Sequence, residues 1–215
     1  RAIAFAQANS DQCVATVGIH PHEAANLTLE QITSQLEELD ALAKDEKVVA
    51  VGECGFDFYY NDKNELLERQ EALLRGQIAI ARKYGLPLSF HVREAFDDFW
   101  RVFESYSGIS GVLHSFTDRP VHLERAIKYG LSIGINGIAS FISHSWQRDM
   151  FKSIPLENIV IETDAPFLTP HPKRGTINTP ENVIYITNFL AELRGEEPST
   201  IAKVTTANAQ KLFNL

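Results

Sequence analysis

Short apolar runs alternate with longer stretches of helical periodicity along this chain. The runs are rich in valine, isoleucine and leucine, as strands covered on both faces are; they lie at residues 13–19, 48–53, 86–90, 111–113, 131–135 and 159–163. Apolar residues at spacings of three and four predict helices near residues 29–44, 65–84, 95–106, 120–129, 147–153, 181–194 and 199–213. This alternation of strand and helix predicts βα units and a parallel sheet.

The alternation by itself fits two α/β folds, an open doubly wound sheet and a closed (β/α)8 TIM barrel. An open sheet binds ligands only at the strand ends beside its switch point. A barrel collects active-site residues from the ends of many strands on one rim. Polar residues close nearly every predicted strand, so the sequence favours the barrel. No linker or low-complexity segment interrupts residues 1–215, and we expect a single domain.

Composition narrows the class of protein. The 215 residues are 44% hydrophobic and 22% charged, as in ordinary globular proteins, and no apolar run is long enough to span a membrane. A net charge of −8 argues against a broad basic face for nucleic acid, but it allows an enzyme that holds one phosphate through bound cations. The two cysteines, Cys13 and Cys54, form neither a CxxC pair nor a disulfide framework, which indicates the cytoplasm.

Four side chains suited to metal binding each close an apolar run: Glu53, His91, His114 and Asp164. In a barrel they converge from separate strands onto one rim. Two carboxylates and two imidazoles suit one or two divalent ions such as Zn²⁺, Mn²⁺ or Mg²⁺. Such an ion activates water for hydrolysis, and Asp164 could accept the proton from that water. For any one of these histidines by itself, a hydrogen-bonded role in the core or at the rim is the simpler interpretation.

Other residues are candidates for contact with a substrate. His20 also closes a strand, and Pro21 follows it, so we expect it either to support the metal ligands or to touch substrate. Arg93, Lys173 and Arg174 could neutralise a phosphate, although surface salt bridges use the same side chains.

The aromatic segment at residues 56–60 is predicted to be a loop whose rings pack on the top of the barrel or stack on bases. His122 and His144 stand in polar surroundings, and we expect both at the surface.

Seven motifs appear in order over nearly the whole chain, at residues 18–22, 51–57, 90–95, 113–116, 161–166, 174–180 and 205–213. With these motifs the chain resembles the TatD family of metal-dependent deoxyribonucleases, within the amidohydrolase-like barrels. The resemblance implies a 3′-to-5′ exonuclease that acts on the ends of single-stranded DNA or RNA, and we expect it to be a monomer.

The resemblance also implies roles for single residues. Glu53 corresponds to a ligand shared by two metals, and His91 and His114 to ligands of the second metal. Asp164 corresponds to a ligand of the first metal and to the base. Contacts with substrate are expected from His20, Phe56, Arg93, Arg174 and Asn178.

One departure from the family pattern concerns the beginning of the chain. Family members open with a strand that carries a His-x-His pair, which supplies two ligands of the first metal, whereas this sequence begins at what resembles the end of the first helix. We therefore expect a barrel that lacks about one βα unit. Two other hypotheses stay open: an esterase, lactonase or amidase for a small molecule, and an inactive truncated barrel that binds metal.

Overall fold

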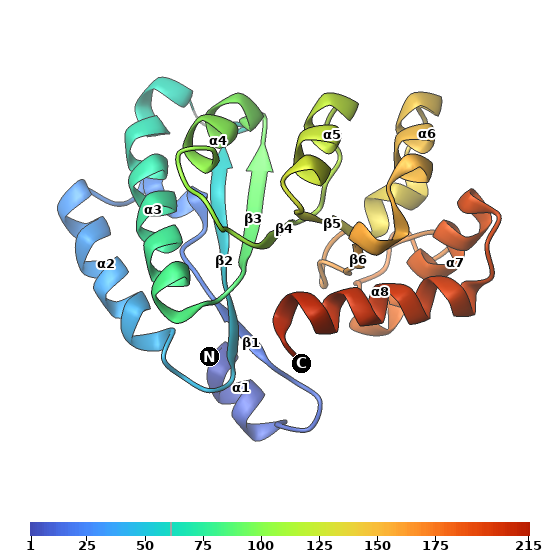
Figure 1. The fold of residues 1–215 in the computed structure, drawn as a ribbon, viewed down its shortest axis with the longest axis horizontal. Helices are drawn as coiled ribbons and strands as arrows, with labels where there is room; N and C mark the ends of the chain where they lie inside the picture. Colours follow the sequence, from blue (N-terminus) through green and yellow to red (C-terminus); the bar gives the residue numbers. More distant parts are fainter. Residues whose placement is uncertain (61) are drawn as a thin grey trace. The chain divides into compact units, whose positions relative to one another are not determined.

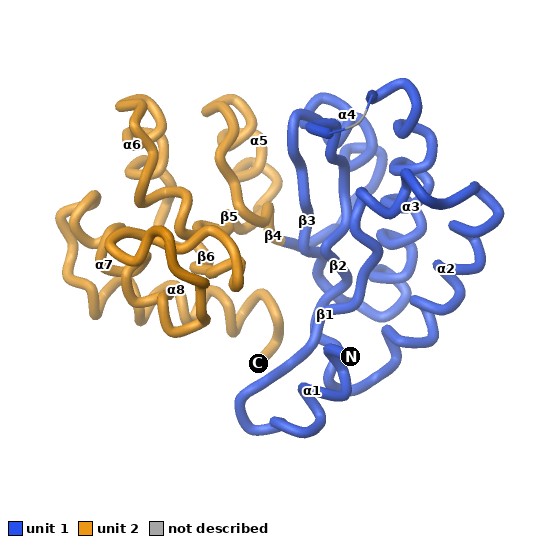
Figure 2. The backbone as a smooth tube through the Cα atoms, turned by 180° about the vertical axis from the view of Figure 1, so that it is seen from behind, with its two compact units in different colours: residues 1–111 blue, residues 112–215 orange. Residues whose placement is uncertain are grey.

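The computed structural model describes residues 1–60 and 62–215, and these form two compact units, Arg1–Gly111 and Val112–Leu215 (Figures 1 and 2). In both units, parallel strands alternate with helices. That the two units make up one domain remains a prediction.

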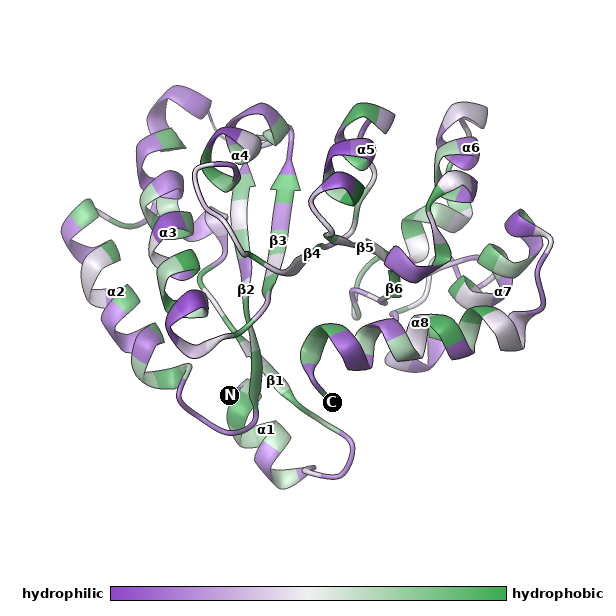
Figure 3. Cartoon of the chain, in the orientation of Figure 1, coloured by the Kyte–Doolittle hydropathy of each residue, from purple (hydrophilic) through white to green (hydrophobic). Residues whose placement is uncertain are grey.

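The first unit, blue in Figure 2, contains a three-stranded parallel sheet. Its elements are α1 (Ala2–Ala8), β1 (Ala15–Val17), η1 (Pro21–Ala25), α2 (Leu29–Leu42), β2 (Val48–Asp57), α3 (Lys63–Tyr84), β3 (Leu88–Arg93) and α4 (Phe96–Phe103). The central strand, β2, pairs in parallel with both β1 and β3. Helices α2 and α3 pack side by side, and Figure 3 shows hydrophobic and hydrophilic residues alternating along them, as expected of helices with one apolar face.

The second unit, orange in Figure 2, repeats this organisation around β5. It contains β4 (Gly111–Leu113, whose first residue belongs to the first unit), α5 (Pro120–Lys128), β5 (Ser132–Ile135), η2 (Gly137–Phe141), α6 (Ser145–Ser153), η3 (Leu156–Asn158), β6 (Ile159–Ile161), η4 (Pro180–Asn182), α7 (Val183–Arg194) and α8 (Pro198–Phe213). Strand β5 pairs in parallel with β4 and with β6. The six βα alternations predicted from the sequence are therefore confirmed.

Local signals in the sequence set the ends of the helices. Thr28 and Gln31 form a capping box at the start of α2, in which each side chain accepts a hydrogen bond from the main-chain N–H of the other. Gly85 ends α3 in the left-handed conformation with φ +66°. Most of the apolar runs are buried as predicted, but residues 13–19 alternate, with Val14 and Thr16 exposed, so the prediction of a strand covered on both faces is wrong for β1. Burial raises the pKa of the fully buried Cys54 thiol, which suits packing better than reactivity.

Two strands are longer than predicted. Strand β2 continues past Glu53 to Asp57, and β3 continues past His91 to Arg93. The ladder pairs Gly55 with His91 and Asp57 with Arg93, so hydrogen bonding continues beyond the polar residues. The prediction assumed that a polar residue ends a buried strand, whereas here such residues face the site while the strand continues. The predicted loop at residues 56–60 is therefore wrong for its first two residues.

His122 was also predicted wrongly. It is 4% exposed rather than at the surface, and its Nε2 lies 3.0 Å from Nη2 of Arg119 and 3.5 Å from Oδ1 of Asp118. These polar neighbours, just before the start of α5, make burial of the imidazole tolerable. His144 is exposed, as predicted. Among the helices within residues 1–60 and 62–215, none is both long and apolar enough to cross a membrane.

Candidate metal centre

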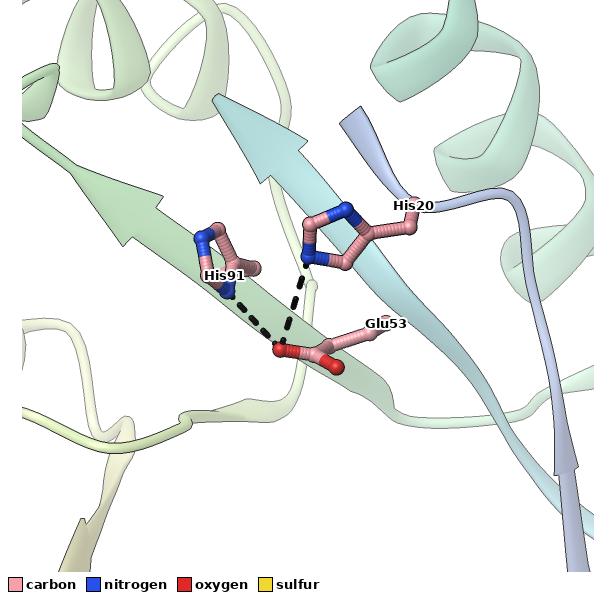
Figure 4. A group of neighbouring side chains, drawn as sticks. All are labelled: His20, Glu53 and His91. Carbon is pink, nitrogen blue, oxygen red and sulfur yellow. Dashed lines mark hydrogen bonds and ion pairs between the residues drawn. The ribbon is translucent and has the colours of Figure 1, made fainter. Parts of the chain in front are cut away.

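Three side chains with metal-binding atoms meet in the first unit (Figure 4). His20 follows β1, Glu53 lies on β2 and His91 lies on β3. One ligand atom from each residue lies within 4.8 Å of the others. Nδ1 of His91 is 2.8 Å from Oε1 of Glu53, and Nε2 of His20 is 3.9 Å from the same oxygen. One carboxylate and two imidazoles, all partly exposed, fit a divalent ion such as Zn²⁺ or Mn²⁺.

Glycines on either side of Glu53 allow β2 and β3 to approach this closely. Gly52 has φ +149° and Gly55 has φ +148°, a conformation that L side chains rarely adopt. A Cβ at Gly52 would collide with the main-chain oxygen of Ser89, and one at Gly55 with that of His91. The two glycines therefore set the spacing that brings Glu53 beside His91.

Asp57, which the sequence analysis did not single out, joins this group. Its side chain is 1% exposed, and Oδ2 lies 2.8 Å from Nε2 of His22 and 2.9 Å from Nε2 of His91. The buried amide of Gln70, on α3, holds the main chain of Asp57 through both its N–H and its C=O. Asp57 lies four residues after Glu53 on the same strand, and this even spacing was the signal that could have revealed it.

The charges of this group follow from burial and hydrogen bonding. Burial, and repulsion from His91, lower the pKa of His20 to about 4, so His20 is neutral at pH 7. Burial opposes the charge of Asp57, but hydrogen bonds from His91, the Tyr59 N–H and His22 outweigh it and hold the pKa of Asp57 well below its usual value. Burial likewise opposes protonation of His91, but its hydrogen bonds to Asp57 and Glu53 outweigh burial and raise the pKa of His91.

The second unit holds another group of acids and an imidazole. Nδ1 of His114 lies 2.8 Å from Oε2 of Glu162, and Nε2 of His114 lies 3.5 Å from Oδ1 of Asp164. The other oxygen of Glu162 accepts a hydrogen bond from the main-chain N–H of Ser115. Gly134 makes room for the Glu162 carboxylate, because a Cβ there would lie 2.6 Å from Oε2. Sequence reasoning missed Glu162, although its position two residues before Asp164 was a usable signal.

The structure thus brings together Glu53 with His91 in the first unit, and His114 with Asp164 in the second. Each of the four predicted metal ligands has a predicted partner ligand within 3.5 Å. That all four surround one metal centre remains a prediction.

Apart from His20, which lies beside Glu53, the residues predicted to contact substrate fall into two groups. Arg93 and Arg174 are exposed, and each guanidinium lies over an aromatic ring, Arg93 at 3.5 Å from the centroid of Tyr59 and Arg174 at 3.8 Å from that of Phe141. Both cations are therefore accessible to a phosphate.

Phe56 and Asn178 are enclosed instead. Phe56 is fully buried, and its ring packs near that of Phe58. Asn178 is 3% exposed, and its amide donates hydrogen bonds to the main-chain oxygens of Thr163 and Phe167. This burial argues against the predicted substrate contacts of Phe56 and Asn178, and indicates packing for the first and bracing of the loop after β6 for the second.

The α/β fold and these acid–imidazole groups are those expected of a metal-dependent hydrolase. Residues 1–214 match the model of the family described as "TatD related DNase", and the chain belongs to that family. The resemblance seen in the motifs is therefore confirmed.

Relatives and solved structures agree with this assignment. The chain is 36% identical over 218 residues to the 3′-5′ ssDNA/RNA exonuclease TatD of Rahnella sp.. This match covers 98% of this chain and 81% of that protein. The chain is 34% identical over 207 residues to YabD of Bacillus subtilis, an uncharacterized metal-dependent hydrolase, with 95% of this chain and 79% of that protein covered. The crystal structure of YJJV, a TatD homologue from Escherichia coli, superposes with a TM-score of 0.82 at 31% identity, covering 99% of this chain and 82% of the other. The fold class is thus confirmed, while the missing βα unit remains a prediction.

Proposed function

We propose that this chain is a divalent-metal-dependent nuclease that removes nucleotides from the 3′ ends of single-stranded DNA or RNA. The observation that carries the proposal is the meeting of Glu53 and His91, with His20 beside them, in a chain of the TatD family. The relative from Rahnella sp., named as a 3′-5′ ssDNA/RNA exonuclease, supports the substrate and the direction. We place the enzyme in the cytoplasm, as a monomer.

The metal ligands in this proposal are Glu53, His91, His114 and Asp164. A divalent ion bound by these residues would supply Lewis acidity and would lower the pKa of a water used in hydrolysis. Asp164, whose side chain is partly exposed, accepts the proton of the attacking water. Asp57 and Glu162 hold the imidazoles of His91 and His114 in place through hydrogen bonds.

The second unit offers a surface for the nucleic acid strand. A pocket of about 440 Å³ lies beside α7, lined by Ser140, Arg148, His171, Pro172, Tyr185, Asn188, Phe189 and Glu192. Two cations lie over rings that line it, Arg148 at 5.6 Å from the centroid of Phe189 and Lys173 at 5.8 Å from that of Tyr185. Cations interleaved with aromatic rings suit single-stranded nucleic acid, because phosphates pair with the cations and bases stack on the rings. Arg148 and Lys173 place two positive charges beside the Glu192 carboxylate in the pocket lining, on a chain whose net charge is −8.

A labelled oligonucleotide tests the proposal. With Mg²⁺ or Mn²⁺, single-stranded substrate labelled at the 3′ end should release labelled mononucleotide in the first turnover, and substrate labelled at the 5′ end should shorten stepwise. EDTA should stop both reactions. A panel of small esters, lactones and amides run beside it addresses the alternative substrates. Hydrolysis of these small molecules without release of nucleotides would contradict the proposal.

A further inference from the structure

The two imidazoles beside Glu53 differ in what contacts the ring nitrogen that points away from it (Figure 4). For His91 that contact is a carboxylate, Asp57, and for His20 it is a main-chain N–H, that of His22. We propose that this difference divides their roles: His91 binds the metal through Nδ1, whereas His20 is a hydrogen-bond donor to a phosphate oxygen of the substrate and is not a metal ligand. The inference rests on the proposed function, because it assigns residues within that site.

Asp57 prepares His91 to be a ligand. Both ring nitrogens of His91 face a carboxylate, Nδ1 at 2.8 Å from Oε1 of Glu53 and Nε2 at 2.9 Å from Oδ2 of Asp57. A cation held by Glu53 would take the place of a hydrogen on Nδ1, and the neutral ring would then keep its hydrogen on Nε2, where the ionised Asp57 carboxylate accepts it. A carboxylate behind a metal-bound imidazole fixes both the tautomer and the ring orientation. Asp57 is itself held rigidly, because Gln70 binds its main chain and the Tyr59 N–H binds its Oδ1.

In His20 the hydrogen is instead on the ring nitrogen that faces Glu53. Its Nδ1 accepts a hydrogen bond from the main-chain N–H of His22, at 3.2 Å, and so caps the first turn of η1. An acceptor nitrogen carries no hydrogen, so in the neutral ring the hydrogen is on Nε2, the atom that faces Glu53. A nitrogen that carries hydrogen cannot coordinate a metal. Coordination through Nε2 would move the hydrogen to Nδ1, against the N–H of His22, and break the cap.

A fixed N–H donor beside the metal ligands suits an anionic oxygen of the substrate. The side chain of His20 is 29% exposed, so an incoming group can reach it. A phosphate oxygen is a strong acceptor that accepts from a neutral imidazole N–H. His20 therefore positions the phosphodiester next to Glu53 and His91 rather than adding a third protein ligand to their metal.

Metal affinity separates the two roles without any measurement of nuclease activity. Zn²⁺ affinity of the full chain is measured by competition with a chelating dye for the unsubstituted protein and for His91→Gln, Asp57→Asn and His20→Gln. The first two variants should bind Zn²⁺ about 10–100-fold more weakly. His20→Gln should keep its Zn²⁺ affinity within about threefold but lose affinity of the Zn²⁺-loaded protein for inorganic phosphate. Asp98→Asn, which removes the charge of a partly buried aspartate that pairs with Lys63 in the same unit, is the matched control.

The tautomers are measured directly by ¹⁵N NMR of the histidine side chains in the unsubstituted protein. This measurement requires no variant, so misfolding of a variant cannot affect it. The metal-free protein at neutral pH should show His20 with hydrogen on Nε2, and the Zn²⁺-loaded protein should show His91 with hydrogen on Nε2. Hydrogen on Nδ1 of His20, or a tenfold loss of Zn²⁺ affinity in His20→Gln, overturns the inference. A protein that shows the expected tautomers and affinities but releases no nucleotides contradicts the proposed function instead.

Discussion

His114 Nδ1 lies 2.8 Å from Oε2 of Glu162, and this contact in the second unit has a counterpart in the first, where His91 Nε2 lies 2.9 Å from Oδ2 of Asp57. Each imidazole therefore stands between one carboxylate predicted to bind metal and a second carboxylate predicted only to hold the ring. The nitrogen that faces the carboxylate predicted to bind metal differs, being Nδ1 in His91 and Nε2 in His114. The two units reach the same local chemistry through opposite edges of the ring.

Glu162→Gln tests whether this second carboxylate matters to catalysis. The amide is a weaker partner for the ring of His114, so the imidazole should lose basicity and orientation. We expect turnover of labelled oligonucleotide to fall at least about tenfold, with metal content reduced. Glu157→Gln, an exposed position on η3, is the matched control and should behave as the unsubstituted protein. Equal turnover in the two variants would show that Glu162 has no part in the site.

Glu53→Gln tests the ligand assignment itself. The amide keeps the shape of the side chain but removes the charge that attracts a cation, so both activity and bound metal should be lost. Because the side chain of Glu53 is 35% exposed and belongs to the site rather than to the core, the melting temperature of the metal-free variant should remain close to that of the metal-free parent. Metal content by mass spectrometry and turnover of oligonucleotide are the measurements. Unchanged turnover would falsify the assignment.

Removal of metal should lower stability as well as abolish activity. An ion that binds only the folded chain stabilises it by about 2.7 kcal/mol when its concentration is about 100 times the dissociation constant. Melting curves with EDTA and with added Zn²⁺ or Mn²⁺ should therefore differ by several degrees. Glu53→Gln should show little of this shift, which controls for ions that bind elsewhere. A shift of the same size in both proteins would mean that the stabilising ion is not held by Glu53.

The sequence predicted much of the fold and part of the site. It located the four side chains expected to bind metal, because a charge or an imidazole after an apolar run is conspicuous. It missed Asp57 and Glu162, because their importance comes from which ring nitrogen they face, and a pattern of burial carries no information on hydrogen-bond partners. The pattern also ended β2 too early, because continuation of the ladder to Asp57 depends on pairing with β3.

Glu71 links stability to pH away from the site. The guanidinium of Arg101 donates a hydrogen bond to this carboxylate, and that of Arg75 adds a second, weaker contribution. Together these bonds outweigh the effect of burial and lower the pKa of Glu71. A carboxylate with a lowered pKa stabilises the fold above the usual glutamate pKa of about 4.3, and this contribution is lost as the pH falls through the lower folded value. Glu71→Gln should therefore cost about 1 kcal/mol of unfolding free energy at pH 7 and little in strong acid.

Urea denaturation across this pH range measures the effect, with Glu68→Gln, at an exposed position on the same helix, as the control. A loss that is the same at all pH values would mean that the charge of Glu71 contributes nothing and that only its packing matters.

Arg174→Ala tests a predicted phosphate contact beside the proposed surface for nucleic acid, because Arg174 lies over Phe141, whose ring centroid is 6.3 Å from that of the pocket residue His171. The guanidinium of Arg174 is exposed and rests 3.8 Å from the centroid of Phe141, so it can pair with a phosphate without having to be ordered first. Its loss should raise KM for a single-stranded oligonucleotide by about tenfold, the equivalent of about 1.4 kcal/mol, and change kcat less.

Lys128→Ala is the matched control, since Lys128 also lies over a ring, that of Tyr129, but at the end of α5. The difference between the two variants should shrink as salt is added, because phosphate contacts are screened by counterions. Equal KM values for Arg174→Ala and the parent protein at low salt would remove Arg174 from the path of the strand.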